Sequence, residues 1–295
     1  MSEEKSSPNG IIVVVAVIAV VAAFFVGKSA GGNGDQTAGN QQQPTNGSDT
    51  NKTTPPPEPP KPEKPAEPTE PAFVKEGLVA YYPFNGNAKD ESGNGNDLTS
   101  KGTTLTKDRH GNADSAYAFD GSTYMEAPND VSMQLTEFTV SFWIDPIEWT
   151  KNTALLMKDG HASGQNYGMW LNPEGGSPRH PTFQIYSAKR KPGGGYFGIG
   201  IKSPKPVSMN AYSMLTGTFS DKELLLYVNG LLVASQKTEM VPGVGNQPLF
   251  LGYDGGFQNG RYNKFKGTMD DVRIYSRALS EEQVTALYDW EKPKE

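Results

Sequence analysis

The chain has no cysteine, and this absence removes several kinds of chemistry at once. Disulfide bonds, thiolate metal sites and cysteine nucleophiles are excluded. A basic stripe is missing as well, because the net charge is −6 and both signs are interspersed along the chain. Since phosphate binding needs clustered Lys and Arg, the chain is not predicted to bind nucleic acid.

Aromatic residues are almost absent from the first quarter of the chain. Phe24 and Phe25 are the only ones before Phe73, and nearly all Trp, Tyr and Phe lie beyond that residue. An ordered core is therefore expected only in residues 73–290, a length within the range of one β-sandwich or barrel.

One long apolar run precedes this region. Residues 11–27, IIVVVAVIAVVAAFFVG, carry no charge and are long enough to cross a bilayer as a short helix. No good pair of small residues for cleavage lies beyond the run, so we predict an uncleaved signal anchor. Residues 1–10 would then form a short cytoplasmic tail and the large domain would lie outside. If the run is cleaved, the protein is secreted instead.

Residues 28–72 have the composition of a disordered stalk. The first part is rich in Gly, Asn, Gln and Thr, which predicts flexibility. Residues 55–71 contain nine prolines. Proline favours the extended polyproline II conformation, which predicts a semi-rigid spacer of roughly 50 Å at about 3.1 Å per residue. We therefore expect a domain displayed at a distance from the membrane.

From residue 77 onward, short runs of Val, Ile, Tyr, Phe and Thr alternate with clusters of Gly, Asn, Asp and Pro. A dozen such runs without intervening helices predict an all-β fold, a two-sheet antiparallel jelly-roll sandwich. The clearest hairpin is LLLYVNGLLVAS, where Asn229-Gly230 is typical of a type I′ turn.

A short helix is predicted to end the fold. Ser280 would cap it, Gln283 would complete a capping box, and Val284, Leu287 and Tyr288 would form its apolar stripe. Residues 291–295 are assigned to a charged tail.

Five motifs, in order, resemble those of laminin-G-like, concanavalin-A-like jelly-roll domains of bacterial surface proteins. They are LVAYYPFNGNAKDESGNGND, AYAFDGSTYMEAP, FTVSFWIDP, YSMLTGTFSDKELLLYVNGLLVAS and FKGTMDDVRIYSRALSEEQVTALY. The resemblance covers residues 77–289. It departs from the family where Tyr212 and Met214 stand, since Trp and His are frequent there. It implies a β-sandwich that binds carbohydrate or a surface partner.

Glucanases of this fold need paired carboxylates. They place Glu-x-Asp-x-x-Glu along one strand, and the nearest approach here, WIDPIE, begins with Trp143, which we interpret as core packing. His110, His161 and His180 lack metal-ligand spacing and are expected at the surface. There is no GxSxG motif, and the glycines at 193, 195 and 198 precede no helix pattern. The chain is therefore not predicted to be an enzyme.

A structural calcium ion is a hypothesis for the Asx-rich segment 85–97. An EF-hand is rejected because Lys101 stands where the last ligand should be. The resemblance implies another arrangement, in which Asn85 and Asp90 would bind calcium together with Asp270 and Asp271. These two adjacent acids have no obvious basic partner except Arg273, so they would repel unless something neutralises them. Alternatively, Asp270 caps the opening loop and Asp271 pairs with Arg273.

Two loops combine aromatic and polar residues as carbohydrate sites do. The candidate ligand-binding residues are Lys189, Arg190, Tyr196 and Phe197 in the first loop, and Tyr253, Asp254, Phe257, Arg261 and Tyr262 in the second. The basic first loop suits an acidic polysaccharide. Alternatively, both loops are solvated hairpins whose aromatic side chains cover the sheet ends.

The sequence thus predicts a membrane-anchored, extracytoplasmic binding module without catalytic activity, for a polysaccharide, a cell-surface glycan or a surface protein. A structural or protein–protein adhesion module is the alternative. A glycoside hydrolase with a different carboxylate pair is a further, weaker one.

Overall fold

The computed structural model describes residues 69–148, 152–158, 166–174, 177–190, 192, 196–255 and 263–294. All of them belong to one unit, residues 67–295. The predicted anchor 11–27 and most of the predicted stalk lie outside the described residues. Within the described ranges no helix is long and apolar enough to cross a membrane.

The described residues form short antiparallel strands and little helix, as the sequence predicts. The strands are β1 (Leu78–Tyr82), β2 (Thr99–Lys101), β3 (Thr104–Thr106), β4 (Ala116–Asp120), β5 (Tyr124–Ala127), β6 (Phe138–Pro146), β7 (Thr153–Lys158), β8 (Tyr167–Glu174), β9 (Ser177–Arg190), β10 (Tyr196–Lys202), β11 (Ser213–Ser220), β12 (Glu223–Val228), β13 (Leu231–Lys237), β14 (Leu249–Leu251) and β15 (Lys266–Tyr275). The helices are the 3-10 turns η1 (Ala72–Lys75) and η2 (Val131–Met133) and the α-helix α1 (Glu281–Glu291). The sequence did not predict β2, β3 or the two 3-10 turns.

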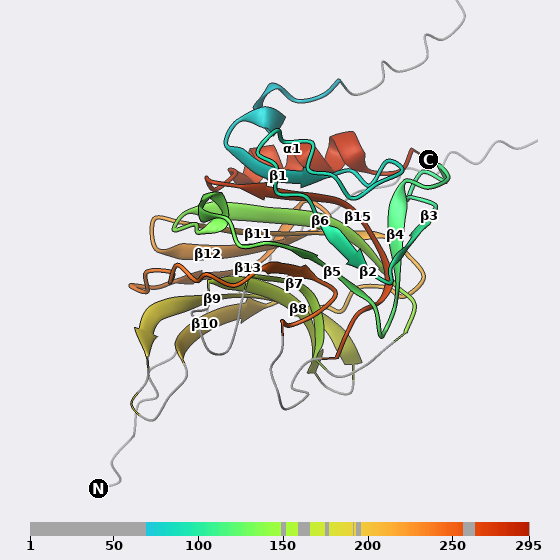
Figure 1. Ribbon diagram of the computed structural model, residues 1–295. Coiled ribbons are helices and arrows are strands. Elements are labelled where there is room, and N and C mark those ends of the chain that lie inside the picture. Colours follow the sequence, from blue (N-terminus) through green and yellow to red (C-terminus); the bar gives the residue numbers. More distant parts are fainter. Residues whose placement is uncertain are drawn as a thin grey trace, which may run out of the picture. The chain divides into compact units, whose positions relative to one another are not determined.

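These strands pair into two sheets that face each other (Figure 1). In sheet A the order is β13-β12-β11-β6-β15-β4-β3, and β1 also pairs with β15. In sheet B the order is β10-β9-β8-β7-β14-β5-β2. In both sheets, strands that are neighbours often come from distant parts of the chain. The fold is therefore a two-sheet antiparallel sandwich, as predicted.

The main core lies between the sheets and follows the alternation of each strand. On β6, Phe138, Val140 and Phe142 point inward and are fully or almost fully buried. Burying a side chain of this size contributes about 1.5–3 kcal/mol. The residues between them point to the other face of sheet A.

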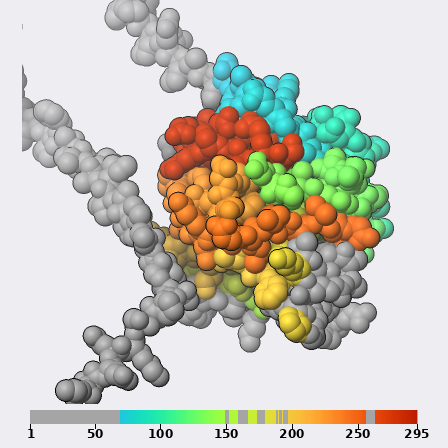
Figure 2. Space-filling view, turned by 90° about the vertical axis from the view of Figure 1, so that its left-hand side faces the viewer, coloured from blue at the N-terminus to red at the C-terminus, as the bar shows by residue number. Residues whose placement is uncertain are grey.

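Helix α1 covers part of that other face, as Figure 1 shows. Its predicted capping box is confirmed, because Ser280 Oγ accepts a bond from the Gln283 N–H and the Gln283 side chain accepts one from the Ser280 N–H. Val284 and Leu287 are buried in a second apolar cluster. In Figure 2 the red helix lies above the orange strands of sheet A, where Thr285 Oγ1 donates to the Gly230 carbonyl at 3.0 Å.

The predicted hairpin is also confirmed. Asn229 and Gly230 join β12 to β13 with φ values of 51° and 74°. Two successive positive φ angles define the type I′ turn, which matches the twist of the strands it joins.

The Asx-rich segment 85–97 is a defined loop that lies along β1. The Asp90 carboxylate accepts bonds of 2.9 Å from the backbone N–H groups of Tyr81, Ser92 and Asn96. In this loop, a side chain therefore accepts the backbone N–H groups that have no partner in a regular strand or helix.

Candidate functional site

A β-bulge in β15 brings two adjacent acids to the same side of sheet A. The register of β15 against β6 shifts between Asp270 and Arg273, and Asp271 has a φ of 45°. A bulge adds one residue to its strand, so Val272 points into the main core in place of Asp271. Both aspartates therefore lie on the face that looks away from sheet B.

Arg109 neutralises these acids from a loop far away in the sequence. Asp108 fixes the loop, because its carboxylate accepts the N–H groups of His110 and Asn112 at 2.9 and 2.8 Å. The Arg109 guanidinium pairs with Asp270 and, at 2.7 Å, with Asp271.

Arg109 also holds the end of the helix. Its Nε donates to the Glu291 carbonyl at 2.7 Å. A cation at a helix C-terminus is favourable, because the last carbonyls have no partner within the helix.

Arg273 is the second buried cation of this cluster. It forms an ion pair with the Glu291 carboxylate and another, at 3.4 Å, with Asp271. Its guanidinium lies 4.0 Å from the ring centre of Tyr81 and 5.6 Å from that of Trp290. The cluster thus joins β1, β15 and the end of α1.

Trp143 has a structural role, in agreement with the sequence interpretation, but it packs in the cluster beneath α1 and not between the sheets. Its Nε1 donates to the Glu291 carboxylate at 2.7 Å and its ring stacks on Tyr288 at 5.7 Å. The assignment of Glu291 to a charged tail, residues 291–295, is wrong. Glu291 is the last residue of α1 and is buried.

Burial changes the acidity of the three carboxyl groups. Burial and the neighbouring Asp271 raise the pKa of Asp270 to about 7, against the attraction of Arg109. Burial, opposed by Arg273, also raises the pKa of Glu291 to about 7. For Asp271, Arg273 and Arg109 outweigh burial and hold the pKa below its usual value.

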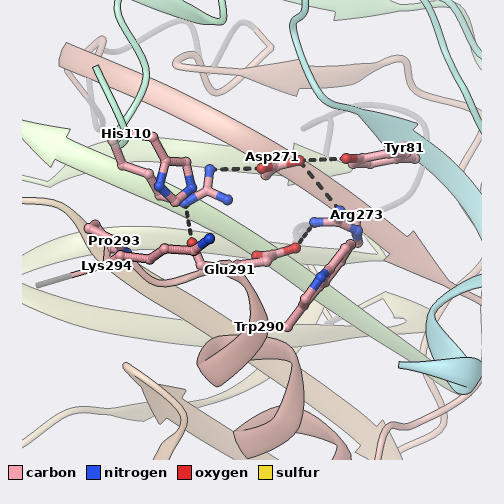
Figure 3. Close-up of a pocket in the computed structure, with 9 residues that line it drawn as sticks. Tyr81, His110, Asp271, Arg273, Trp290, Glu291, Pro293 and Lys294 are labelled. Carbon is pink, nitrogen blue, oxygen red and sulfur yellow. Dashed lines mark hydrogen bonds and ion pairs between the residues drawn. The ribbon is translucent and has the colours of Figure 1, made fainter. Parts of the chain in front are cut away.

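A pocket of about 680 Å³ opens beside this cluster (Figure 3). Five members of the charged cluster line the pocket: Tyr81, Arg109, Asp271, Arg273 and Glu291. The lining is completed by His110, by Trp290 of α1, and by Pro293 and Lys294 after the helix. Hydrolysis by two carboxylates needs room between them for a sugar. Here the guanidinium of Arg273 bridges Asp271 and Glu291, so these two acids do not form such a pair.

The residues predicted to bind calcium do not meet in one group. Asn85 is exposed, Asp90 holds the opening loop, and Asp270 and Asp271 bind Arg109. Among the described residues, no group of three or more His, Asp or Glu could hold a metal ion. The missing counter-charge on which the calcium argument rested is supplied by Arg109. Calcium at this loop stays a prediction, which melting curves with EDTA and with calcium would decide.

The alternative given for these acids is half correct. Asp271 does pair with Arg273. The opening loop, however, is capped by Asp90 and by Asp97, which accepts the Asp90 N–H at 2.9 Å, and not by Asp270. Of the histidines expected at the surface, His180 is buried, with its Nδ1 2.9 Å from the Ser203 carbonyl oxygen.

The two predicted ligand loops are only partly described. In the first, Lys189 and Phe197 are exposed, and Arg190 pairs with Tyr196 across β9 and β10. In the second, Tyr253 is half-buried and Asp254 is buried. Phe257, Arg261 and Tyr262 lie outside the described residues.

Tyr253 belongs to a group of side chains on the outer face of sheet B, which we call the aromatic face. It consists of four aromatic residues and one cation: Tyr124, Trp170, Phe250, Tyr253 and Lys264. Along β14, Leu249 and Leu251 face the main core, so Phe250 between them points outward. The rings of Tyr124 and Tyr253 are 4.7 Å apart.

The cation of the aromatic face lies against both tyrosines. The Nζ of Lys264 is 4.7 Å from the ring centre of Tyr124 and 5.0 Å from that of Tyr253. Of this group, only Tyr253 was predicted from the sequence. The available signal was the run LFL, which is apolar at every position and so indicates a strand with both faces covered.

Comparisons with known proteins agree with this architecture. The laminin G model of the concanavalin A-like lectin/glucanases superfamily matches residues 119–285. A search of curated protein sequences gave no match.

Among solved structures, the chain is similar to domain 4 of AbnA, an extracellular arabinanase from Geobacillus stearothermophilus, solved in complex with arabinotriose. The identity is 21%, the TM-score is 0.51, and the match covers 72% of this chain and 98% of that one. The binding domain of Paraclostridial Mosquitocidal Protein 1 matches at 22% identity and a TM-score of 0.56, over 72% of this chain and 52% of that one.

The botulinum neurotoxin serotype D binding domain matches at 17% identity and a TM-score of 0.54, over 74% of this chain and 52% of that one. The chain thus spans about half the length of these toxin domains. At such identities the likeness is one of fold.

Proposed function

The chain belongs to the concanavalin A-like lectin/glucanase superfamily, and from this premise we propose that it is a non-catalytic module that binds carbohydrate. In this proposal, residues 11–27 anchor the protein in a membrane and residues 28–72 hold the sandwich away from it, outside the cell. Its partner is a polysaccharide or a cell-surface glycan.

The aromatic face is the observation that carries the proposal. The outer face of an antiparallel sandwich is ordinarily polar, because it meets water. Here it presents two half-buried tyrosines above the buried rings of Trp170 and Phe250. Aromatic rings with polar tips suit the apolar faces and hydroxyl groups of sugars.

The absence of catalysis is part of the proposal. The two carboxylates whose pKa is raised furthest, Asp270 and Glu291, are buried on sheet A and are bound to Arg109 and Arg273. Strongly shifted pKa values also arise in structural ion-pair networks, and that explanation fits a cluster that fastens a helix to a strand.

The test is affinity electrophoresis of the full chain in mild detergent, through gels that contain arabinan, xylan, β-glucan or polygalacturonate. We expect at least one polysaccharide to retard the chain. Tyr253→Ala should abolish most of this retardation, because the stacking of a sugar on the aromatic ring is lost with the ring. Tyr253→Phe keeps the ring and should remain retarded.

Two results would contradict the proposal. One is that no polysaccharide in the panel retards the wild-type chain. The other is that Tyr253→Ala and wild type move alike in the gel that retards both, which would place binding away from the aromatic face.

A further inference from the structure

We propose that the Nζ of Lys158 and the side-chain carboxamide of Asn129 join in an isopeptide bond, which the folded chain forms by itself. Neither residue belongs to the aromatic face or lines the pocket in Figure 3. The inference therefore stands or falls independently of the proposed function.

Lys158 is a buried lysine whose neighbours are neutral acceptors. It is the last residue of β7 and is 1% exposed. Leu156, two residues earlier, lies in the main core, so the alternation of β7 points Lys158 to the same side. Its hydrogen-bond partners are the carboxamide oxygen of Asn129 and the backbone carbonyls of Gly245 and Gln247. Lysine is rarely buried this fully without a charged partner, so the position calls for an explanation.

Burial turns this amine into a nucleophile. It lowers the pKa of Lys158 to about 8, against the charge of Asp130, which acts in the other direction. Part of the population therefore carries the neutral amine at neutral pH. Only the neutral amine has a lone pair to give, which is why a desolvated lysine is an activated nucleophile.

The carboxamide of Asn129 is the group that this amine can attack and replace. Nζ lies 2.6 Å from Oδ1. Because a C=O bond is about 1.2 Å long, Cγ of Asn129 lies within about 4 Å of Nζ. The carbonyls of Gly245 and Gln247 also accept from Nζ, but attack there would cut the main chain. Holding two groups close to an attack geometry replaces a bimolecular encounter by an effectively unimolecular step.

The reaction balances with the two side chains alone. The lone pair of Nζ attacks Cγ, the bond from Cγ to Nδ2 of Asn129 breaks, and one proton passes from Nζ to Nδ2. Ammonia leaves, and a new amide joins Lys158 to Asn129. No oxidant, reductant or co-reactant is consumed, so folding is sufficient to start the reaction.

The bond would fasten two segments that lie on opposite sides of β14. Asn129 follows β5 and Lys158 ends β7, and both strands pair with β14 in sheet B (Figure 1). A covalent link between residues distant in the chain stabilises a fold mainly by restricting the unfolded state. We therefore expect the link to raise the melting temperature.

The experiment is the intact mass of the denatured full chain, followed by a tryptic digest and tandem mass spectrometry. We expect a mass lower than that of the sequence by one ammonia. The digest should contain a branched peptide, in which residues 110–151 are joined through Asn129 to Lys158 in residues 152–179. A succinimide at an Asn-Gly pair loses the same mass, but it leaves Lys158 open to trypsin, so residues 152–158 would appear as a separate peptide.

Two variants each remove one partner. Lys158→Met has no amine and Asn129→Ala has no carboxamide, so each should have the full mass of its sequence and should melt at a lower temperature than wild type. Lys222→Met is the matched control, because it makes the same change at a lysine whose side chain is 61% exposed. This control should still lack one ammonia.

The wild-type digest decides the inference even if a variant fails to fold. A wild-type chain at the full mass of its sequence, with residues 152–158 released separately, would overturn it. A branched peptide joined through another lysine would overturn it as well. So would an ammonia loss that persists in Asn129→Ala.

Discussion

At the scale of single residues, one strained aspartate decides how the charged cluster is built. Asp271 adopts a φ of 45°, a conformation that costs a non-glycine residue of order 1–3 kcal/mol. Its hydrogen bond to Tyr81 and its ion pairs with Arg109 and Arg273 hold it there. Without the bulge, the carboxylate would point into the apolar core.

The first prediction concerns the pH dependence of Asp270. The pKa of the Asp270 carboxyl group is about 7 in the folded protein, against an ordinary value of 3.8 for a solvated aspartate. Between these values the unfolded chain is ionised while the folded protein keeps the proton, so this group costs stability as the pH rises. The free energy of unfolding of wild type minus that of Asp270→Asn should therefore fall across this window, measured by urea denaturation at a series of pH values.

Asp271→Asn is the matched control and has the opposite sign. The pKa of Asp271 is lowered in the folded protein, so its stabilisation is present above the ordinary value of 3.8 and is lost as the pH falls below it. A pH-independent difference between wild type and Asp270→Asn would show that Asp270 does not titrate as described.

At the scale of elements, α1 acts as a clasp across sheet A. Its N-terminus is fixed by a capping box, its buried face packs on Trp143 and Tyr227, and its last residue is held by two arginines. Since the helix also carries Trp290, which lines the pocket, the shape of the pocket depends on how firmly the helix is docked.

The second prediction tests the N-terminal end of this clasp. Ser280→Ala removes the side-chain bond to the Gln283 N–H and should lower the free energy of unfolding by about 0.5–2 kcal/mol. Ser280→Asp keeps an acceptor at the cap and should be close to wild type. Denaturation followed by tryptophan fluorescence measures both, and equal losses in the two variants would show that the cap does not act through this bond.

At the scale of the whole molecule, the two sheets share a core but have outer faces of different character. The outer face of sheet A carries the helix and a buried network of charges. The outer face of sheet B carries the aromatic face. The proposed function places the polysaccharide on the outer face of sheet B.

Most of this architecture could be predicted from the sequence, because its signals are local. Alternation marks the strands, Asn229-Gly230 marks the hairpin, and Ser280 with Gln283 marks the helix start. The acids in the otherwise apolar segment 269–275 were visible too. Their partner was not, since Arg109 lies 161 residues from Asp270 and only the folded topology brings them together.

The bulge was hidden for a related reason. Strict alternation in MDDVRIY would place Asp270 and Asp271 on opposite faces, and no residue type in that run announces an inserted position. The role of Glu291 was missed because a carboxylate beside lysines at a chain end ordinarily indicates a solvated tail.

The most direct test of the central claim is hydrogen–deuterium exchange of the full chain, with and without the polysaccharide that retards it most strongly. The account predicts that protection concentrates on β5, β8 and β14, which carry Tyr124, Trp170 and Phe250, and on the neighbouring residue Tyr253. Protection confined to β13, to α1 or to another part of sheet A would contradict it and would show that the aromatic face is not where the chain binds carbohydrate.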